Sequence, residues 1–178
     1  MKKRNFLKTG SAFASFVVLS NLSGCTTAQA TNDAEQSAQA ASGLKADGSE
    51  FEVVKTEAEW REILSPEAYN VLREEGTERP FTSPLNKIYA AGTYSCAGCD
   101  LPLYSSETKF DSGTGWPSFY APLENAVATS VDNSFFMTRT EVHCRRCGGH
   151  LGHIFNDGPE PTGERHCLNG VALSFTEA

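Results

Sequence analysis

The sequence of 178 residues has no apolar run near its start that is long enough to anchor it across a membrane. The stretch 13–22 is interrupted by Ser15, Ser20 and Asn21, whereas a spanning helix takes roughly 20 apolar residues. The sequence also lacks an internal repeat of solenoid length. The missing repeat excludes a repeat array, and the overall composition excludes a multi-span membrane protein. A content of 39% hydrophobic and 21% charged residues is typical of a globular domain.

Basic residues are also scarce. The formal net charge is −7, and the first 24 residues hold Lys2, Lys3, Arg4 and Lys8 without any acid. The rest of the chain therefore has 11 basic and 22 acidic residues, a formal charge of −11. Because nucleic-acid-binding surfaces are basic, we expect no nucleic-acid partner.

The N-terminus has the pattern of an export signal. A basic segment, residues 2–8, precedes the short apolar stretch, and the sequence Leu22-Ser23-Gly24-Cys25 then resembles a bacterial lipobox. We predict that residues 1–24 are a lipoprotein signal peptide and that Cys25 is acylated; the alternative is an ordinary signal peptide with a chance Cys. The expected product is an exported bacterial lipoprotein, anchored in the membrane by its lipid and facing the periplasm or the cell exterior.

Residues 3–8 also resemble a twin-arginine export motif with Lys at the first Arg position, although a generic basic segment has the same composition. The twin-arginine route moves folded proteins. A metal site would then be loaded in the cytoplasm before export.

Residues 25–50 are predicted to form a disordered tether that begins at the lipidated Cys25. The segment is rich in small and polar residues, and Leu44 is its only large apolar residue. It cannot bury enough surface to offset the entropy of ordering. The folded domain is therefore expected to cover residues 51–178.

Within this domain the pattern changes from helix to strand. Residues 56–59 have capping-box spacing and open an apolar helical face over residues 60–64. Ser65-Pro66 predicts the start of a second short helix, which is expected to end at Gly76. Beyond Gly92, Gly, Pro, Asn and Asp separate short β-favouring runs, namely 127–131, 135–142 and 171–175. We expect a mostly-β domain preceded by two short helices.

Four of the six cysteines form two CxxC pairs. Each pair places two thiolates on one side of a tight turn, and two facing pairs give the tetrahedral sulfur site that suits zinc. The ligands would be Cys96, Cys99, Cys144 and Cys147, and the ion would be structural because four Cys ligands leave no position for water. With 44 residues between the pairs, the metal would join distant strands. The alternative in an exported protein is two disulfides.

Cys167 is then left as an unpaired thiol. Arg165 and His166 precede it, and such neighbours favour a thiolate. Alternation along a strand would place Arg165, Cys167 and Asn169 on one face and His166 on the other, so Arg165 would be the local cation. Cys167 is therefore a candidate nucleophile; the alternative is a buried structural Cys.

Two more segments carry candidate site residues. His150 and His153 follow a CxxC pair, so a metal that holds this segment rigid would also hold the imidazoles. By themselves, two surface histidines are the simpler interpretation. In residues 113–119, the glycines before Trp116 indicate a backbone that presents the indole at a cleft, although Trp116 and Phe119 would also fit a core.

These segments together resemble the methionine-R-sulfoxide reductases of the B type. The resemblance runs from Thr56 to Phe175, nearly the whole of the predicted domain. The segments that carry it are residues 59–60, 64–66, 76–81, 92–94, 96–99, 109–113, 115–119, 139–142, 144–148, 150–155, 157–159, 161–163 and 167–169.

The resemblance implies a β-fold of two antiparallel sheets with short N-terminal helices and a structural zinc site of four cysteine ligands. It implies that the substrates are oxidised proteins that carry methionine-R-sulfoxide residues. The site residues that it implies are catalytic Cys167, His150, His153, Arg165 and Asn169, of which Arg165 and Asn169 hold and polarise the site, and substrate-binding Trp116, Phe119 and Phe155.

The chemistry agrees with these roles. A sulfoxide oxygen is a poor leaving group until it is protonated, so His150 and His153 would bind and protonate it. The Cys167 thiolate would attack the sulfoxide sulfur and become a sulfenic acid, which is reversible. Trp116 would pack on the substrate methyl group, and an apolar ring on one side with donors on the other selects one epimer.

The sequence departs from the family pattern at two positions. Thr114 stands where many relatives carry a resolving Cys, and His166 stands where Tyr is usual. We therefore expect no intramolecular disulfide in the cycle; a thioredoxin-like partner or a small thiol would reduce the Cys167 sulfenic acid. The expected role is repair of oxidised envelope proteins by a monomer, and the effect of His166 is left open.

Two other interpretations compete with this one. A non-enzymatic zinc-knuckle binding module needs the four CxxC cysteines but not Cys167, His150, His153 or Trp116. An exported structural lipoprotein stapled by disulfides needs no zinc, and its cysteines would be paired.

Overall fold

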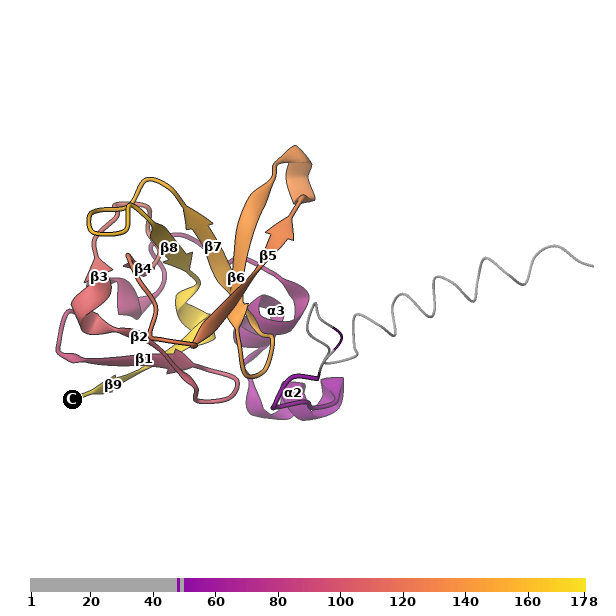
Figure 1. Cartoon of the computed structure of the whole chain (residues 1–178). Coiled ribbons are helices and arrows are strands. Elements are labelled where there is room, and N and C mark those ends of the chain that lie inside the picture. Colours follow the sequence, from indigo (N-terminus) through magenta and orange to yellow (C-terminus); the bar gives the residue numbers. More distant parts are fainter. Residues whose placement is uncertain (1–47, 49) are drawn as a thin grey trace, which may run out of the picture. The chain divides into compact units, whose positions relative to one another are not determined.

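The structure is a computed structural model that describes Gly48 and residues 50–178. The predicted signal peptide, Cys25 and nearly all of the predicted tether therefore lie outside the described residues. Within them, two α-helices precede nine β-strands (Figure 1). None of the helices in this part of the chain has the length and apolar content that crossing a membrane requires.

Both predicted helices form. They are α2, Glu57–Ile63, and α3, Pro66–Glu74. The Thr56 side chain accepts a hydrogen bond from the Glu59 N–H and completes the predicted capping box, while Ser65 caps α3 with Pro at its first position.

The second helix ends two residues before the predicted end. Glu75 adopts a left-handed conformation with φ of 55°, and the Gly76 N–H donates to the Asn70 carbonyl at 2.9 Å. Gly76 thus belongs to the C-terminal cap of α3 and not to its last turn.

The strands form two antiparallel sheets, as predicted. The smaller sheet has the order β2-β1-β9, and its strands are β1 Gly92–Cys96, β2 Pro102–Ser105 and β9 Leu173–Glu177. The larger sheet has the order β3-β4-β8-β7-β6-β5. Its strands are β3 Lys109–Phe110, β4 Ser118–Phe119, β5 Val127–Asp132, β6 Arg139–Cys144, β7 His150–Phe155 and β8 Arg165–Leu168.

Short 3-10 helices occupy several connections, namely η1 Pro84–Lys87, η2 Ser106–Thr108, η3 Ser134–Phe136 and η4 Gly170–Ala172. Two of them replace the starts of predicted β runs. The run 135–142 begins in η3, where the Ser134 N–H donates to the Asp132 carboxylate at 2.8 Å. The run 171–175 begins in η4, whose first N–H groups, on Gly170 and Val171, donate to the carboxylate of Glu78, far away in the sequence. The contact between η4 and Glu78 is a tertiary one, and strand propensity does not take such contacts into account.

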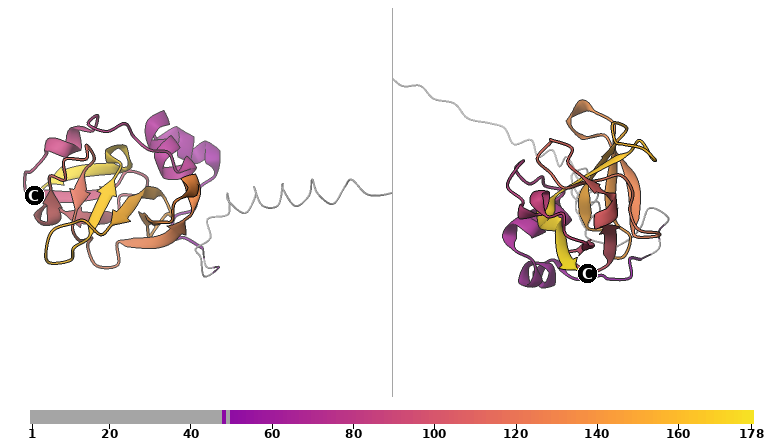
Figure 2. Two further views of the ribbon diagram at one scale, coloured as in Figure 1. Left: turned by 90° about the horizontal axis from the view of Figure 1, so that it is seen from above. Right: turned by 90° about the vertical axis from the view of Figure 1, so that its left-hand side faces the viewer.

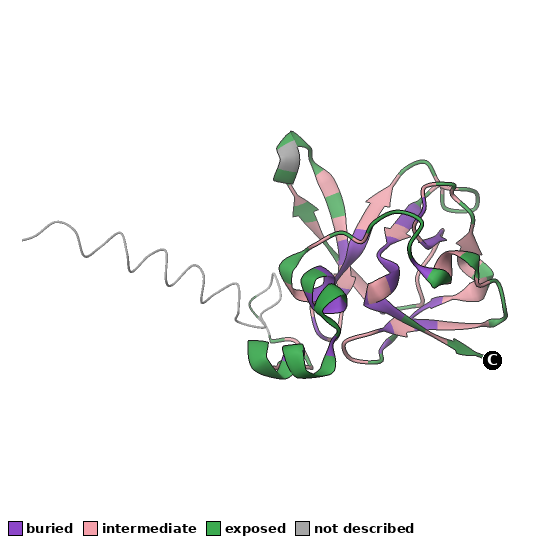
Figure 3. Cartoon of the chain, turned by 180° about the vertical axis from the view of Figure 1, so that it is seen from behind, coloured by how far each residue is buried: buried purple, intermediate pink, exposed green. Residues whose placement is uncertain are grey.

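One hydrophobic core joins the two sheets and α3. The fully buried rings of Tyr94, Tyr104 and Phe119 form its aromatic part, with Tyr94–Phe119 and Tyr104–Phe119 centroid distances of 4.9 and 4.6 Å. Helix α3 packs on β7 and η4 (Figure 2). The β5–β6 hairpin projects from this body, and its tip is exposed (Figure 3).

Candidate active site and metal centre

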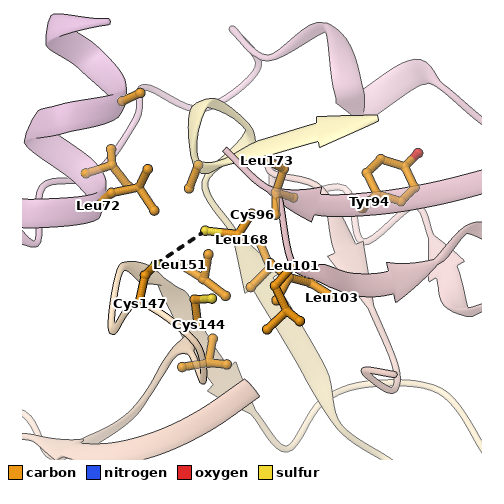
Figure 4. Packing of buried hydrophobic residues seen from close by; sticks show 14 of the residues in the cluster. Leu72, Tyr94, Cys96, Leu101, Leu103, Cys144, Cys147, Leu151, Leu168 and Leu173 are labelled. Carbon is orange, nitrogen blue, oxygen red and sulfur yellow. Dashed lines mark hydrogen bonds between the residues drawn. The ribbon is translucent and has the colours of Figure 1, made fainter. Parts of the chain in front are cut away.

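The four CxxC cysteines meet where the two sheets adjoin. Cys96 ends β1 of the smaller sheet, Cys144 ends β6 of the larger sheet, and Cys99 and Cys147 lie in the turns that follow. All four Sγ atoms lie within 4.8 Å of one another, and all four cysteines are free thiols. The Cys96–Cys147 sulfur distance is 3.7 Å (Figure 4). The Cys99–Cys144 sulfur distance is 3.5 Å.

This geometry fits one zinc ion. Zn–S bonds of about 2.3 Å place the sulfur atoms of a regular tetrahedron about 3.8 Å apart. The donor set is entirely sulfur, which suits zinc, and it leaves no position for water. The four cysteines therefore form a structural zinc site that links the two sheets, and the disulfide alternative does not fit the free thiols.

Neighbouring residues hold the two turns in place. Arg73 of α3 donates from Nη1 to the Cys147 carbonyl at 3.1 Å, and Arg146 donates from Nη1 to the Cys99 carbonyl at 3.2 Å. A Cβ at Gly148, where φ is 69°, would lie 2.4 Å from the Phe51 ring. Phe51, the first residue of the predicted domain, thus packs on the second CxxC turn. Only glycine at position 148 leaves room for so close an approach.

Cys167 lies on β8, which runs between β4 and β7 in the larger sheet. Its Cα pairs with Ser118 on β4 and with His153 on β7. The Thr114 hydroxyl is 3.9 Å from its Sγ. Burial raises the pKa of the Cys167 thiol, and the opposing effects of Thr114 and Arg165 do not cancel it. Arg165 thus favours the thiolate, as expected of a neighbouring cation, but burial outweighs it.

A β-bulge brings the two predicted histidines together. On a regular strand, residues three apart point to opposite faces. Here Val142 pairs with Gly152 while His143 pairs with His150, so β7 has one extra residue opposite β6. The His150 and His153 rings therefore lie on one face, with centroids 5.4 Å apart.

Two acids of the β5–β6 hairpin hold these imidazoles. The Asp132 carboxylate is 2.8 Å from His153 Nε2, and the Glu141 carboxylate is 2.8 Å from His150 Nδ1. Burial lowers the pKa of His153 below its usual value even though Asp132 opposes this shift, so His153 is neutral near pH 7. The pKa of Asp132 is lowered, first by the Ser134 N–H and also by His153.

Glu141 and His150 are less accessible. Burial raises the pKa of Glu141, but the contacts with His143, His150 and Ser130 outweigh it and lower the pKa. His150 is 3% exposed, and among the described residues its Nε2 atom has no hydrogen-bond partner. His150 therefore lies behind His153.

A hollow of about 140 Å³ contains the surface of Cys167. This volume accommodates roughly one side chain. Its lining residues are Thr77, Trp116, Arg139, Gly152, His153, Phe155, Cys167, Leu168 and Asn169. The hollow therefore combines aromatic walls, an imidazole, an amide and a thiol.

The turn before Trp116 fixes the indole at this hollow. Gly115 has φ of 93°, and a Cβ there would lie 2.8 Å from the Phe81 backbone nitrogen. The Trp116 indole donates from Nε1 to the Glu78 carbonyl at 2.9 Å. The glycine-rich turn thus presents Trp116 at a cleft, as the sequence predicts.

Glu78 connects two walls of the hollow. Besides accepting from Trp116, its backbone N–H donates to Asn169 Oδ1 at 2.8 Å. Its carboxylate accepts from the Gly170 N–H at 2.6 Å and from the Val171 N–H at 3.3 Å. Glu78 is therefore a residue of the site that the sequence reasoning left without a role.

Arg165 lies behind the hollow and supports Phe155. Its guanidinium binds both carboxylate oxygens of Asp157, at 2.8 and 3.0 Å, and lies 4.3 Å from the centroid of the Phe155 ring. The bond from Arg165 lowers the pKa of Asp157. Because Arg165 also lowers the pKa of Cys167, it is the local cation, as alternation predicts.

Two further residues point away from Cys167. Phe119 is fully buried in the aromatic core and does not line the hollow, so its assignment to the substrate site is wrong. His166 is buried on the face opposite to Cys167, with its Nδ1 3.0 Å from the Tyr104 hydroxyl and its Nε2 3.1 Å from Glu164. The burial of His166 lowers its pKa.

The structure thus brings Cys167, His153, Trp116, Phe155 and Asn169 to one hollow. Sequence reasoning missed the acids that hold these residues and the neighbouring His150, namely Glu78, Asp132, Glu141 and Asp157. Glu78, Glu141 and Asp157 lie in segments that carry the family resemblance, and this position is the sequence signal that could have identified them. Asp132 lies outside them, and only strand pairing brings it to His153.

The sequence of the chain is similar to those of known proteins. The sequence model of the SelR domain matches residues 64–177. The peptide methionine sulfoxide reductase MsrB of Methanosarcina mazei is 55% identical over 126 residues, which cover 70% of this chain and 90% of that protein. The MsrB of Pseudomonas putida is 59% identical over 122 residues, which cover 68% and 92% of the two chains.

A more distant likeness exists among solved structures. The crystal structure of the Mis18 "Yippee-like" domain covers 49% of this chain and 97% of its own, with 16% identity and a TM-score of 0.41. This likeness is too low to bear on function.

Proposed function

The chain belongs to the MsrB family of peptide methionine sulfoxide reductases, and we propose that Cys167 is the nucleophile with which it reduces methionine-R-sulfoxide residues of oxidised proteins. The observation that carries this role is the shared hollow: the thiol, the His153 imidazole and the Trp116 indole line the same 140 Å³. The binding-module alternative is not favoured, since it requires none of these three side chains.

The walls of the hollow differ in polarity in the way a sulfoxide requires. The sulfur of methionine sulfoxide carries an apolar methyl group and a polar oxygen. Trp116 and Phe155 provide aromatic surface for the methyl group, and His153 and Asn169 provide polar groups for the oxygen. This arrangement holds one epimer with its sulfur toward Cys167 and its oxygen toward His153.

In the proposed step the Cys167 sulfur attacks the sulfoxide sulfur while the oxygen takes up a proton. The attack forms a bond between the two sulfur atoms. The protonated oxygen then passes to the Cys167 sulfur as the S–O bond and the new S–S bond to the substrate sulfur break, and the substrate leaves as the thioether, which keeps the S–S electron pair. Methionine is the reduced product, and the Cys167 sulfenic acid is the oxidised one.

The resting protonation states supply the proton for this step. Burial raises the pKa of Cys167 and lowers that of His153, so the pair rests as a thiol and a neutral imidazole. The thiol proton passes by way of His153 to the departing oxygen, and no proton need come from outside. Asp132 holds His153 and stabilises its charged form during the transfer.

The sulfenic acid is reduced by a partner. The side chain of Thr114, whose hydroxyl lies 3.9 Å from the Cys167 sulfur, offers no second thiol, and the other four described cysteines belong to the metal site. Two equivalents of an external thiol, or one dithiol of a thioredoxin-like protein, would restore the Cys167 thiol and release a disulfide and water. Zinc plays no part in this cycle, because its four protein ligands leave no position for substrate.

The N-terminal sequence supports a location for this activity. The lipobox Leu22-Ser23-Gly24-Cys25 would place an acyl anchor on Cys25, and residues 26–50 would tether a monomeric domain outside the cytoplasmic membrane. Cys25→Ala should then move the protein from the membrane fraction to the soluble fraction and remove the acyl mass. An unchanged distribution would contradict lipidation.

The proposed activity is tested with the separate epimers of N-acetyl-methionine sulfoxide amide and with dithiothreitol as reductant. The full chain should turn over the R epimer and leave the S epimer unchanged. Reduction of S alone, or of neither epimer by zinc-loaded protein, would contradict the proposal.

A further inference from the structure

A second hollow has the residue Trp116 in common with the catalytic one. Its volume is about 350 Å³, and Trp116 lines both hollows. Its other principal residues are Phe81, Tyr89, Lys87, Lys109 and Phe110. None of these five has a part in the chemistry proposed for Cys167.

The size of the catalytic hollow makes a neighbouring site necessary. Its 140 Å³ admits little more than the oxidised side chain itself. In a polypeptide substrate, the residues next to the methionine sulfoxide must therefore lie on the surrounding surface. The second hollow is near enough to receive them, since it shares the lining residue Trp116 with the catalytic hollow.

The rim of this second hollow exposes two aromatic rings. Phe81 is 73% exposed and Tyr89 is 58% exposed. Phe81 has a left-handed backbone with φ of 65°, which is unusual for a bulky residue, and the bond from its N–H to the Gly115 carbonyl at 2.7 Å holds it there. Exposed aromatic side chains held in place are typical of protein recognition sites.

Hydrogen bonds hold the residues of the second hollow in place, so the hollow is preformed. Asn86 donates from Nδ2 to the Gly115 carbonyl at 2.6 Å, and Lys109 donates from Nζ to the Asn86 carbonyl at 3.1 Å. The Lys109 ammonium also lies 4.0 Å from the centroid of the Tyr89 ring. A preformed site binds with less loss of conformational entropy.

The charge of the hollow is opposite to that of the chain around it. Lys87 and Lys109 line it together with one acid, Asp111, whose carboxylate accepts from the Gly113 N–H. The hollow thus has a net positive charge, whereas residues 25–178 together carry −11. An acidic side chain is therefore attracted here and repelled from most of the remaining surface.

From these features we propose that the hollow lined by Phe81, Lys87, Tyr89 and Lys109 is a subsite for the residues that flank methionine-R-sulfoxide in the substrate polypeptide, and that it selects flanks with an aromatic or aliphatic residue next to an acidic one. This inference rests on the proposed function, because it assigns to the catalytic hollow the oxidised side chain. The occupant is the substrate, not the reductant.

The test compares three substrates of the R configuration with dithiothreitol as the only reductant. They are N-acetyl-methionine sulfoxide amide, a peptide with Phe and Asp on both sides of the oxidised residue, and the same peptide with Lys in place of each Asp. The proteins are the full chain and its variants Tyr89→Ala and Lys87→Gln. Lys55→Gln is the matched control, since it removes one positive charge beside Trp60, outside both hollows.

The full chain should show a higher kcat/KM for the acidic peptide than for the basic one. Lys87→Gln should lower kcat/KM for the acidic peptide about two- to fivefold, and Tyr89→Ala should lower it for both peptides by about fivefold or more. Both variants should retain the rate on the unflanked amide, and Lys55→Gln should match the full chain on all three substrates.

Two results would overturn the subsite. One is equal kcat/KM for the two peptides in the full chain; the other is an equal loss on the unflanked amide and on the peptides, which would mean that the residues only shape the catalytic hollow. If the full chain fails on the unflanked amide as well, the proposed function itself is contradicted, and the subsite with it.

Discussion

His153 and Cys167 are direct cross-strand partners on β7 and β8. A Cβ at Gly152, the residue before His153, would lie 2.0 Å from the Cys167 carbonyl oxygen, so only glycine allows this approach of the two strands. The imidazole and the thiol are therefore placed by the sheet itself and not by a loop. A site on paired strands holds its groups in a fixed geometry. An acid that must protonate one particular oxygen requires such a geometry.

Cys167→Ser should abolish turnover while leaving the fold and the zinc content unchanged. The loss is expected to be on the order of 10³-fold or more, because a hydroxyl cannot take over the role of the nucleophilic sulfur. Zinc should be retained because Cys167 is not among the four clustered cysteines. Steady-state rates measure the loss of turnover, and elemental analysis of the same preparation measures the retained zinc. Residual turnover above about a tenth of the original rate would contradict the assignment of Cys167 as the nucleophile.

His153→Gln should lower kcat by about 10² or more, since the departing oxygen would lose its proton donor. His143→Gln is the matched control: His143 lies on β6, packs edge-on against Phe51 and does not line the catalytic hollow, and Gln is able to keep its contact with Glu141. It should leave kcat nearly unchanged. Equal losses in the two variants would show that His153 has only a structural role.

Glu78→Ala should raise KM more than it lowers kcat. The carboxylate holds the Gly170 and Val171 N–H groups, and without it the Glu78 backbone, which bonds Trp116 and Asn169, is released. Loss of two hydrogen bonds predicts an increase of about fivefold or more in KM. Glu78→Gln keeps an oxygen acceptor and should recover most of the affinity, and failure of this rescue would count against a positioning role.

Removal of zinc should destabilise the folded chain strongly. The ion links β1 of one sheet to β6 of the other, so its loss removes a connection between the two halves of the core. We expect chelation or Cys144→Ser to lower Tm by at least about 10 °C. Scanning calorimetry of metal-loaded and chelated protein measures this, and superimposable melting curves would contradict a structural role.

Acidification from pH 7.5 to pH 5 should lower the free energy of unfolding. The pKa values of His153 and His166 are lowered by burial, so below their unfolded values of about 6.5 the unfolded chain binds more protons than the folded one. Stability is therefore complete above that pH and decreases as the pH falls toward the folded pKa values. His166→Gln should reduce the dependence of Tm on pH, and an unchanged slope would show that His166 does not contribute to it.

The fold and the metal site were predictable because their signals are local. Capping residues, strand alternation and CxxC spacing act over a few residues, and they predicted α2, α3, the mostly-β domain and the four clustered cysteines. The bulge in β7 was not predictable, since it depends on the register between β6 and β7. The same register decides that Glu141 meets His150, so sequence spacing alone could not identify that pair.

Burial was the other quantity that the sequence could not provide. Arg165 favours the Cys167 thiolate, as expected, but the cost of desolvation in the folded sheet is larger and raises the pKa. Phe119 follows Trp116 closely in an aromatic turn, yet β4 directs Phe119 into the core between Tyr94 and Tyr104. An aromatic residue near a site and one in the core have the same sequence signature.

A single-turnover experiment without reductant tests whether Cys167 takes the oxygen from the R epimer. The full chain is mixed with an excess of each epimer of a methionine sulfoxide peptide, treated with a sulfenic-acid trap and digested for mass spectrometry. We expect one equivalent of methionine from the R epimer, none from the S epimer, and the trapped adduct on Cys167. An intrachain disulfide that includes Cys167, or methionine formed without modification of Cys167, would contradict it.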